Sequence, residues 1–274
     1  MTTSKGLLSL VLHAHLPFVR HPEHADMMEE RWLFEAITET YIPLLEVFGK
    51  LVADGIRFRL TMPLTPPLVN MLADEMLIGR YSAHLTRLEE LAEKEIERTR
   101  WQPEFYATAL MYREKFRRIR GIFKACDGNL IRLFKKYQNL GVLDIITCCA
   151  THAFLPLLSD FRPAVRAQIE MAVRDYQKHF ECSPRGIWLA ECAYNPGDDK
   201  ILSDFGIRYF FTDTHGILFA DPRPAYGVHA PVECPSGVLA FGRDVESSRQ
   251  VWSAHEGYPG DFAYREFYRD IGFD

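Results

Sequence analysis

The sequence lacks the features that mark membrane, secreted and nucleic-acid-binding proteins. It contains no run of about 18 apolar residues and no apolar core behind its first residues, so neither membrane insertion nor secretion is expected. Positive charge is not in excess, because 32 Lys and Arg stand against 37 Asp and Glu. The resulting net charge of −5 provides no general attraction to nucleic acid or to an anionic membrane. There is also no internal repeat and no low-complexity linker.

The cysteines lack the CxxC spacing of zinc knuckles and redox motifs. They are Cys126, Cys148, Cys149, Cys182, Cys192 and Cys234. Two of them are adjacent within an apolar run, which indicates buried reduced thiols. We therefore expect the protein in a reducing compartment, the cytoplasm.

The chain alternates between strand-like and helical patterns over its whole length. At 274 residues and 47% hydrophobic composition, it is long enough for one large α/β domain with a sizeable core. Short apolar runs predict strands over 7–12, 58–62, 142–148, 187–189, 207–211 and 238–241. Helical spacing is found over 29–52, 68–100, 105–140, 162–180 and 198–205, with Pro43 expected to kink or divide the first of these. Helical crossovers of this kind predict parallel strands.

Polar side chains follow nearly every predicted strand at the point where it ends. They are His13, His15, His152, Glu191, Asp213 and Arg243. In a β/α barrel the active site is built from the carboxyl ends of several strands. We therefore expect these side chains to meet in one pocket.

His13 and His15 project to the same side of an extended segment, because side chains alternate with a period of two. Paired imidazoles can bind a metal, donate hydrogen bonds to a substrate, or serve as an electrostatic partner for a carboxylate. Their spacing alone leaves these possibilities open.

Glu191 lies at the end of another predicted strand, where Asn195-Pro196-Gly197 stops the chain from continuing. Trp188 and Tyr194 flank it and are expected to form an aromatic wall that binds a sugar. An active-site carboxylate fits this arrangement, as does a structural partner for a nearby Arg or Lys.

Several ordered motifs resemble glycoside hydrolase family 57. The first three sequence regions of that family are similar to His13–Pro17, Cys148–His152 and Trp188–Tyr194. Further along, Arg249–Ser253 with Gly257–Gly260, and Tyr264–Gly272, resemble its 1,4-α-glucan branching enzymes. The resemblance runs from near residue 7 to the last residue.

The resemblance implies an α/β fold, an incomplete (β/α)7 barrel of the TIM-barrel kind, with a long helical insertion around residues 66–140. It also implies a cofactor-free retaining double displacement on α-glucans, in glycogen-type synthesis. Glu191 matches the nucleophile, although Ala190 replaces the Pro that commonly precedes it. The remaining residues are expected to contact the substrate, and the three histidines also to hold the Glu191 carboxylate. They are His13, His15, His152, Trp188, Asp213, Arg243, Trp252 and Gly260.

The chain departs from the family pattern at its end. The family's acid/base Asp and helical C-terminal domain follow the segment that closes this sequence, so residues 1–274 correspond to part of the catalytic barrel domain. Asp213 and Asp244 do not match the acid position. We therefore expect a chain that binds glucan and is inactive or weakly active, since general acid catalysis contributes about 10² to 10⁴-fold.

Two alternatives use the same residues differently. In the first, His13, His15 and Asp213 hold a divalent metal for carbohydrate deacetylation or mannoside cleavage. In the second, the chain is a non-catalytic glucan-binding module. The expected partner is an α-glucan, with neither nucleic acid nor membrane, and no oligomeric state is predicted.

Overall fold

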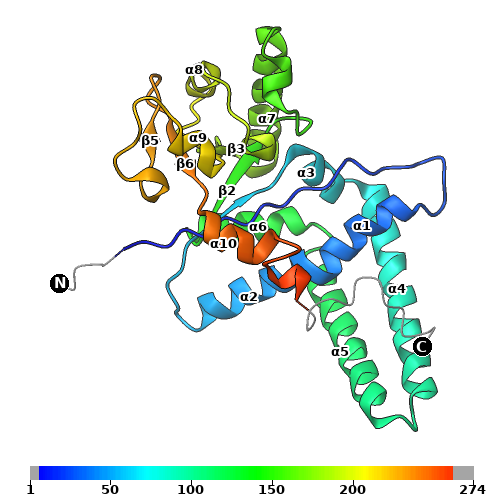
Figure 1. The fold of residues 1–274 in the computed structure, drawn as a ribbon. Helices are drawn as coiled ribbons and strands as arrows, with labels where there is room; N and C mark the ends of the chain where they lie inside the picture. Colours follow the sequence, from blue (N-terminus) through cyan, green and yellow to red (C-terminus); the bar gives the residue numbers. More distant parts are fainter. Residues whose placement is uncertain (1–5, 262–274) are drawn as a thin grey trace. The chain divides into compact units, whose positions relative to one another are not determined.

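The computed structural model describes residues 6–261, which form two compact units (Figure 1). The first unit comprises residues 6–152 and 170–184, and the second comprises 153–169 and 185–261. Helix α7, Arg162–Phe180, contributes to both and has the bounds that the sequence predicts. The motif Tyr264–Gly272 lies outside the described residues.

Two parallel strands form the centre of the first unit. Strand β1, Leu60–Pro63, pairs with β2, Leu143–Cys148, so that Leu60 lies opposite Leu143. Most of β2 is buried, as its continuous apolar run predicts. The predicted strands over 58–62 and 142–148 are therefore confirmed, with slightly different ends.

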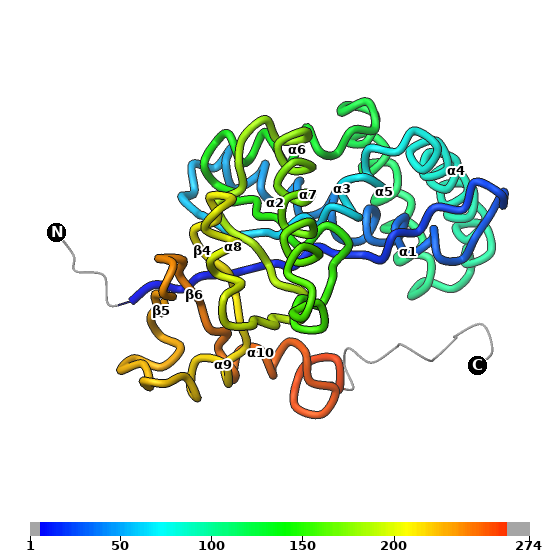
Figure 2. The backbone as a smooth tube through the Cα atoms, turned by 90° about the horizontal axis from the view of Figure 1, so that it is seen from above, coloured from blue at the N-terminus to red at the C-terminus, as the bar shows by residue number. Residues whose placement is uncertain are grey.

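The apolar run over 7–12 does not form the regular strand that we predicted. Leu7 is 98% exposed and Leu8 is 85% exposed, and pairing with β1 is confined to bridges at Val11 and Ala14. The hydrogen bonds to β1 begin at the Leu10 carbonyl, so Leu7 and Leu8 lie before the start of this pairing. Figure 2 shows this segment, in dark blue, as one extended stretch leading to α1.

The helices of the first unit make up most of its mass. They are α1 Met28–Ala36, α2 Ile42–Ala53, α3 Pro66–Leu72, α4 Glu75–Arg98, α5 Pro103–Ala125 and α6 Leu130–Asn139. A π-helical turn, Ile37–Tyr41, separates α1 from α2 just ahead of Pro43, which confirms the predicted division. The helices from α3 to α6 confirm the helical insertion around residues 66–140.

Helices α4 and α5 lie side by side as a long hairpin (Figure 1). Their basic side chains are matched by acidic ones, as in the pairs Arg117–Glu93 and Arg120–Glu89. Large side chains pack between the two helices, with the Tyr81 and Phe123 ring centroids 4.8 Å apart. The charged faces therefore form a solvated, internally neutralised surface.

The second unit contains a mixed ladder of four strands. Strands β3 Gly186–Trp188, β4 Tyr209–Thr212 and β6 Leu239–Gly242 are parallel, and β5 Val232–Glu233 is antiparallel to β6. A side chain at Gly186 would overlap the Tyr209 ring on the neighbouring strand. Glycine is therefore required where β3 begins.

Short helices follow the strands of the second unit. They are α8 Asp198–Asp204, α9 Thr214–Leu218 and α10 Val245–Trp252. The sequence predicted α8, but α9 and β5 were missed because each is too short for a clear apolar period. Helix α10 was missed as well, because none of its residues is buried and no core-facing apolar pattern marks it. Within the described part of the chain, no helix combines the length and apolarity needed to cross a membrane.

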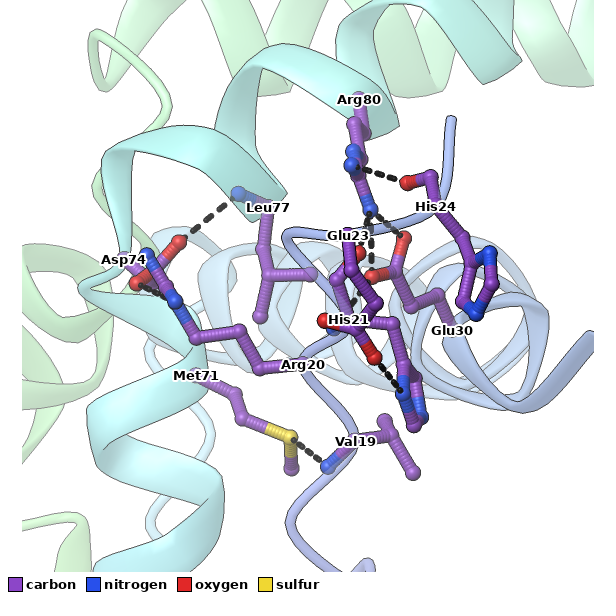
Figure 3. Close-up of polar contacts among 10 residues, drawn as sticks. All are labelled: Val19, Arg20, His21, Glu23, His24, Glu30, Met71, Asp74, Leu77 and Arg80. Atoms are coloured by element: carbon purple, nitrogen blue, oxygen red, sulfur yellow. Dashed lines mark hydrogen bonds and ion pairs between the residues drawn. The ribbon is translucent and has the colours of Figure 1, made fainter. Parts of the chain in front are cut away.

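A buried ion pair fixes the loop that leads from the first histidines to α1 (Figure 3). Glu30, 1% exposed, accepts hydrogen bonds from Arg80 Nη1 at 2.5 and 2.7 Å and from the His21 N–H at 2.9 Å. Arg80 also donates to the carbonyls of His21 and His24. A loop without regular structure is thus tied to α1 and α4 by charge-assisted bonds.

We expect Glu30→Gln to destabilise the protein by about 3 kcal/mol, because it leaves the Arg80 charge without its partner in a mostly buried site. Denaturant unfolding measures the loss. The control is Glu170→Gln, which removes the partner of the exposed Arg174 and should cost far less, because solvent screens that pair. Equal losses for both variants would contradict the role of the buried pair.

Candidate active site

Three histidines from two separate segments meet in the first unit. His15 and His152 stack with ring centroids 3.7 Å apart, and His13 lies 5.9 Å from His15 and 5.6 Å from His152. His152 adopts a left-handed conformation, φ 56°, in the turn after β2, where its N–H donates to the Cys149 carbonyl. The structure thus brings together the residues that two distant motifs place at strand exits.

His13 and His15 are neutral at physiological pH. Burial, and then the neighbouring His152 and His15, lower the pKa of His13 to about 3. Burial and His152 lower the pKa of His15 to about 4. Neutral imidazoles offer both a donor and an acceptor, which suits hydrogen bonding to uncharged hydroxyl groups.

Thr65 orients His15 and was not found from the sequence. His15 Nδ1 lies 3.0 Å from Thr65 Oγ1, and Thr65 is fully buried at the exit of β1. Its place three residues after a predicted strand is the signal that could have found it. This contact holds the Nδ1 atom of His15 in place. The orientation of the Thr65 hydroxyl, as donor or acceptor, then decides which ring nitrogen of His15 carries the proton.

A pocket of about 700 Å³ opens beside His15 and His152. Its remaining wall is formed by Pro17, Phe18, Pro66, Pro67, Asn70, Ala150 and Thr151. Asn70 is held in place by a hydrogen bond to Asp175 at 3.0 Å, and Phe18 is exposed. The volume and the mixture of apolar walls with a few polar groups are typical of small-ligand sites.

Glu191 lies on an unusual turn at the exit of β3, in the second unit. Glu191 has φ 54° and ψ 26°, and Cys192 has φ 57°, so two successive non-glycine residues are left-handed. Such conformations cost on the order of 1–3 kcal/mol each and cluster at functional sites. The Glu191 side chain is exposed, so its carboxylate is accessible.

The exits of β4 and β6 hold this turn. Thr212 Oγ1 donates to the Cys192 carbonyl at 3.1 Å, and Arg243 Nη1 lies 3.8 Å from Cys192 Sγ. The Arg243 N–H in turn donates to the Thr212 carbonyl. Burial raises the pKa of the Cys192 thiol, which therefore stays neutral.

Asp213 is used as a helix cap. Its Oδ1 accepts the Thr214 N–H at 2.8 Å at the start of α9, and its Oδ2 lies 3.4 Å from His215 Nδ1. It belongs to the same strand edge as Glu191 and Arg243, as predicted from the parallel pairing. A role in binding substrate remains a prediction.

The aromatic residues expected around Glu191 behave differently from one another. Trp188 is half-buried, with its ring 5.8 Å from that of Phe211. The Tyr194 hydroxyl donates to Asp199 at 3.0 Å and its ring stacks on Phe210, so Tyr194 serves the packing of the unit. Its expected place in a sugar-binding wall is not supported.

Trp252 and Gly260 belong to the segment after β6. Trp252 is 69% exposed. The Arg243 guanidinium lies over its indole ring, with the Arg243 Cζ atom 5.7 Å from the ring centroid. Gly260 ends a short turn, and a side chain there would overlap the Ala254 carbonyl. Glycine is therefore required by backbone packing, whether or not it also contacts a substrate.

The predicted site residues thus fall into two groups. His13, His15 and His152 cluster in the first unit, and the second unit holds Glu191, Trp188, Asp213, Arg243, Trp252 and Gly260. Over residues 6–261, no three His, Cys, Asp or Glu side chains are placed to hold one metal ion. The donor set that the metal-dependent alternative requires is therefore not assembled there.

Comparison with known proteins gives consistent matches. The model of glycosyl hydrolase family 57 matches residues 9–249. A 1,4-alpha-glucan branching enzyme from Thermococcus kodakarensis is 38% identical over 97% of this chain and 42% of its own length. The chain therefore spans less than half the length of that relative.

Solved structures match over nearly all of the chain. The alpha-amylase AmyC from Thermotoga maritima is 54% identical, with a TM-score of 0.93 over 99% of this chain and 52% of its own. A GH57-type branching enzyme from Pyrococcus horikoshii is 36% identical, with a TM-score of 0.87 over 97% of this chain and 52% of its own. These similarities confirm the predicted α/β class of (β/α)7-barrel type with its helical insertion.

The depressed histidine pKa values predict acid sensitivity. Below pH 6.5, the ordinary value, the unfolded chain binds protons at His13 and His15, whereas the folded chain does so only near pH 3 and 4. Stability is therefore fully present above pH 6.5 and falls as the pH decreases, by at most about 1.4 kcal/mol per pH unit per histidine. Urea unfolding between pH 7 and 4 should show a shallower fall in His13→Asn. Identical pH dependence in both proteins would contradict the prediction.

Proposed function

Because the chain belongs to glycosyl hydrolase family 57, we propose that it carries the nucleophile of a retaining α-glucan-active enzyme and that Glu191 is this nucleophile. The observation that supports the proposal best is the left-handed Glu191–Cys192 turn at the carboxyl end of a parallel strand. A strained backbone persists only where its surroundings hold it, and such strain clusters at functional sites. An exposed carboxylate on a turn that buried partners hold in this way is typical of a positioned catalytic group.

In a retaining reaction, a Glu191 oxygen attacks the anomeric carbon while the bond to the leaving-group oxygen breaks. A second carboxyl group about 5 to 5.5 Å away protonates that oxygen and later activates the acceptor. Asp213 caps α9, and hydrogen bonds from Ser247 hold the pKa of the Asp244 carboxyl below its usual range. We assign the acid/base role to no residue of this chain and propose that residues 1–274 are part of the catalytic barrel domain.

The neutral histidines suit the binding of sugar hydroxyls, and we propose that role for His13, His15 and His152. We propose substrate binding also for Trp188, Asp213, Gly260 and the pair Arg243–Trp252 of the second unit. In that pair, an exposed indole with a cation over one face leaves the other face for a sugar ring. The proposed partner is thus a neutral, hydroxyl-rich α-glucan.

Two activities remain as candidates within this chemistry. We favour 1,4-α-glucan branching, since the branching enzyme from Thermococcus kodakarensis is matched over nearly the whole chain. Hydrolysis is the second candidate, because the alpha-amylase from Thermotoga maritima is 54% identical. Proton NMR of the products made from amylose by the full-length protein distinguishes them: new α-1,6 linkages indicate branching, and new reducing ends alone indicate hydrolysis.

We propose that the protein works in a reducing compartment, the cytoplasm. All six cysteines are thiols that form no disulfide, and Cys126, Cys148, Cys149 and Cys192 are buried. A buried thiol without a disulfide partner is typical of intracellular proteins.

The nucleophile can be tested without the acid, because fluoride leaves from an α-maltotriosyl fluoride without being protonated. We expect Glu191 to displace fluoride and form a glycosyl-enzyme, detected as a mass increase on the peptide that contains Glu191. Glu191→Gln should abolish the increase. The control Glu97→Gln, on the exposed face of α4, should be labelled like the unmodified protein. Labelling at another residue would overturn the assignment.

Trp252→Ala should weaken maltoheptaose binding about fivefold, since it removes about 1 kcal/mol of ring stacking. Its effect on stability should be small because the side chain is exposed. The matched control is Trp101→Ala, at the α4–α5 tip, where an 84% exposed indole also lies under an arginine, Arg100, at 5.1 Å. Calorimetric titration measures both. An equal loss in both variants would count against a specific platform at Trp252.

A further inference from the structure

The left-handed turn at Glu191 is not maintained by its own residues alone. Its local hydrogen bonds run from the Cys192 N–H to the Leu189 carbonyl at 2.8 Å and from the Ala193 N–H to the Ala190 carbonyl at 3.1 Å. Both close small loops within the turn itself. They do not connect it to the ladder that determines where the carboxylate points.

Thr212 supplies that connection. It is the last residue of β4, it is buried, and its hydroxyl donates to the Cys192 carbonyl at 3.1 Å across a sequence separation of 20 residues. The Cys192 carbonyl follows directly after the strained Glu191–Cys192 peptide. Strand β4 is therefore hydrogen-bonded to the turn at Cys192, one residue after Glu191.

The surroundings of Thr212 keep its hydroxyl in this place. Its backbone carbonyl accepts the Arg243 N–H at 3.2 Å, so β4 and β6 are joined at the same level. Gly216 lies over the side chain, and a Cβ at that position would lie 3.0 Å from Thr212 Oγ1. The hydroxyl is thus seated between the Cys192 carbonyl and a glycine that leaves room for it.

We propose that Thr212 is a positioning residue for Glu191: its hydroxyl holds the left-handed turn against β4 and so sets the direction of the nucleophilic carboxylate. This rests on the proposed role of Glu191. Thr212 itself touches no reacting atom. Its effect passes through the Cys192 carbonyl to the Glu191 backbone.

The test compares Thr212→Val, which keeps the shape and removes the donor, with Thr212→Ser, which keeps the donor. With α-maltotriosyl fluoride at saturation, Thr212→Val should slow labelling of Glu191 about 10- to 100-fold, because small misplacements of a reacting group are costly. The donor concentration for half-maximal rate should change little. Thr212→Ser should restore most of the rate.

A matched control separates positioning from stability. Thr38→Val removes another buried threonine hydroxyl, which lies 3.0 Å from the Tyr81 hydroxyl in the first unit. Its loss of thermal stability should resemble that of Thr212→Val, with an unchanged labelling rate. A labelling rate that falls equally in both variants, or in neither, would overturn the proposal.

Hydrogen exchange provides a readout that does not depend on catalysis. In Thr212→Val, the amides of Cys192 and Ala193 should exchange about fivefold faster or more, as expected for a lost hydrogen bond, while Thr38→Val leaves them unchanged. Gly216→Ala, which crowds the Thr212 hydroxyl, should shift exchange in the same direction. Unchanged exchange overturns the Thr212 anchor alone. Labelling of the unmodified protein at a residue other than Glu191 would overturn the assignment of Glu191 as the nucleophile. The positioning role of Thr212 would then fall with it, whatever the hydrogen exchange shows.

Discussion

Parallel pairing places the exits of neighbouring strands at one edge, and the candidate site depends on this constraint. In the second unit, the register aligns Trp188 with Phe211 and Phe211 with Phe241. The next residues of each strand therefore leave the ladder at the same level. Cys192, Thr212 and Arg243 can reach one another because of this alignment, and the hydrogen bonds among them connect the three strand exits.

The same constraint operates in the first unit with a different chemistry. There the pairing of β1 with the extended segment before it brings Thr65 beside His15, and the turn after β2 brings His152 over both histidines. Burial keeps the His13 and His15 rings neutral, so these two residues offer hydrogen bonds without charge. A neutral polyhydroxylated ligand is compatible with such a surface, whereas an anion would gain little from it.

Strain and its compensation are concentrated at the same strand exits. His152, Glu191 and Cys192 all adopt left-handed backbones without being glycine. Each lies in a tight turn that follows a strand. The cost is offset by buried contacts elsewhere, including the hydrogen bonds that Asp199 accepts from Tyr194, Gly197 and Ser236. Folding stability is thus used to hold side chains in positions that an unconstrained chain would not select.

The sequence by itself determined the strand and helix pattern, the family, and the residue types at the strand exits. Apolar runs that end in His, Glu or Arg are local features of the chain. Such features can be recognised from the order of residues in the sequence alone. The sequence could not reveal that pairing with β1 begins only at Leu10. It also could not reveal the elements β5, α9 and α10, or the packing of Tyr194 against Phe210 and Asp199. Those depend on which neighbours a backbone meets in space.

The partners that orient the candidate residues were decided only by the tertiary structure. Thr65 and His15 are 50 positions apart, and Thr212 and Cys192 are 20 apart, so no local pattern links them. The left-handed backbone at Glu191 is equally invisible in the sequence, because neither Glu nor Cys favours it. Only the contacts that the parallel strands impose make that conformation the stable one.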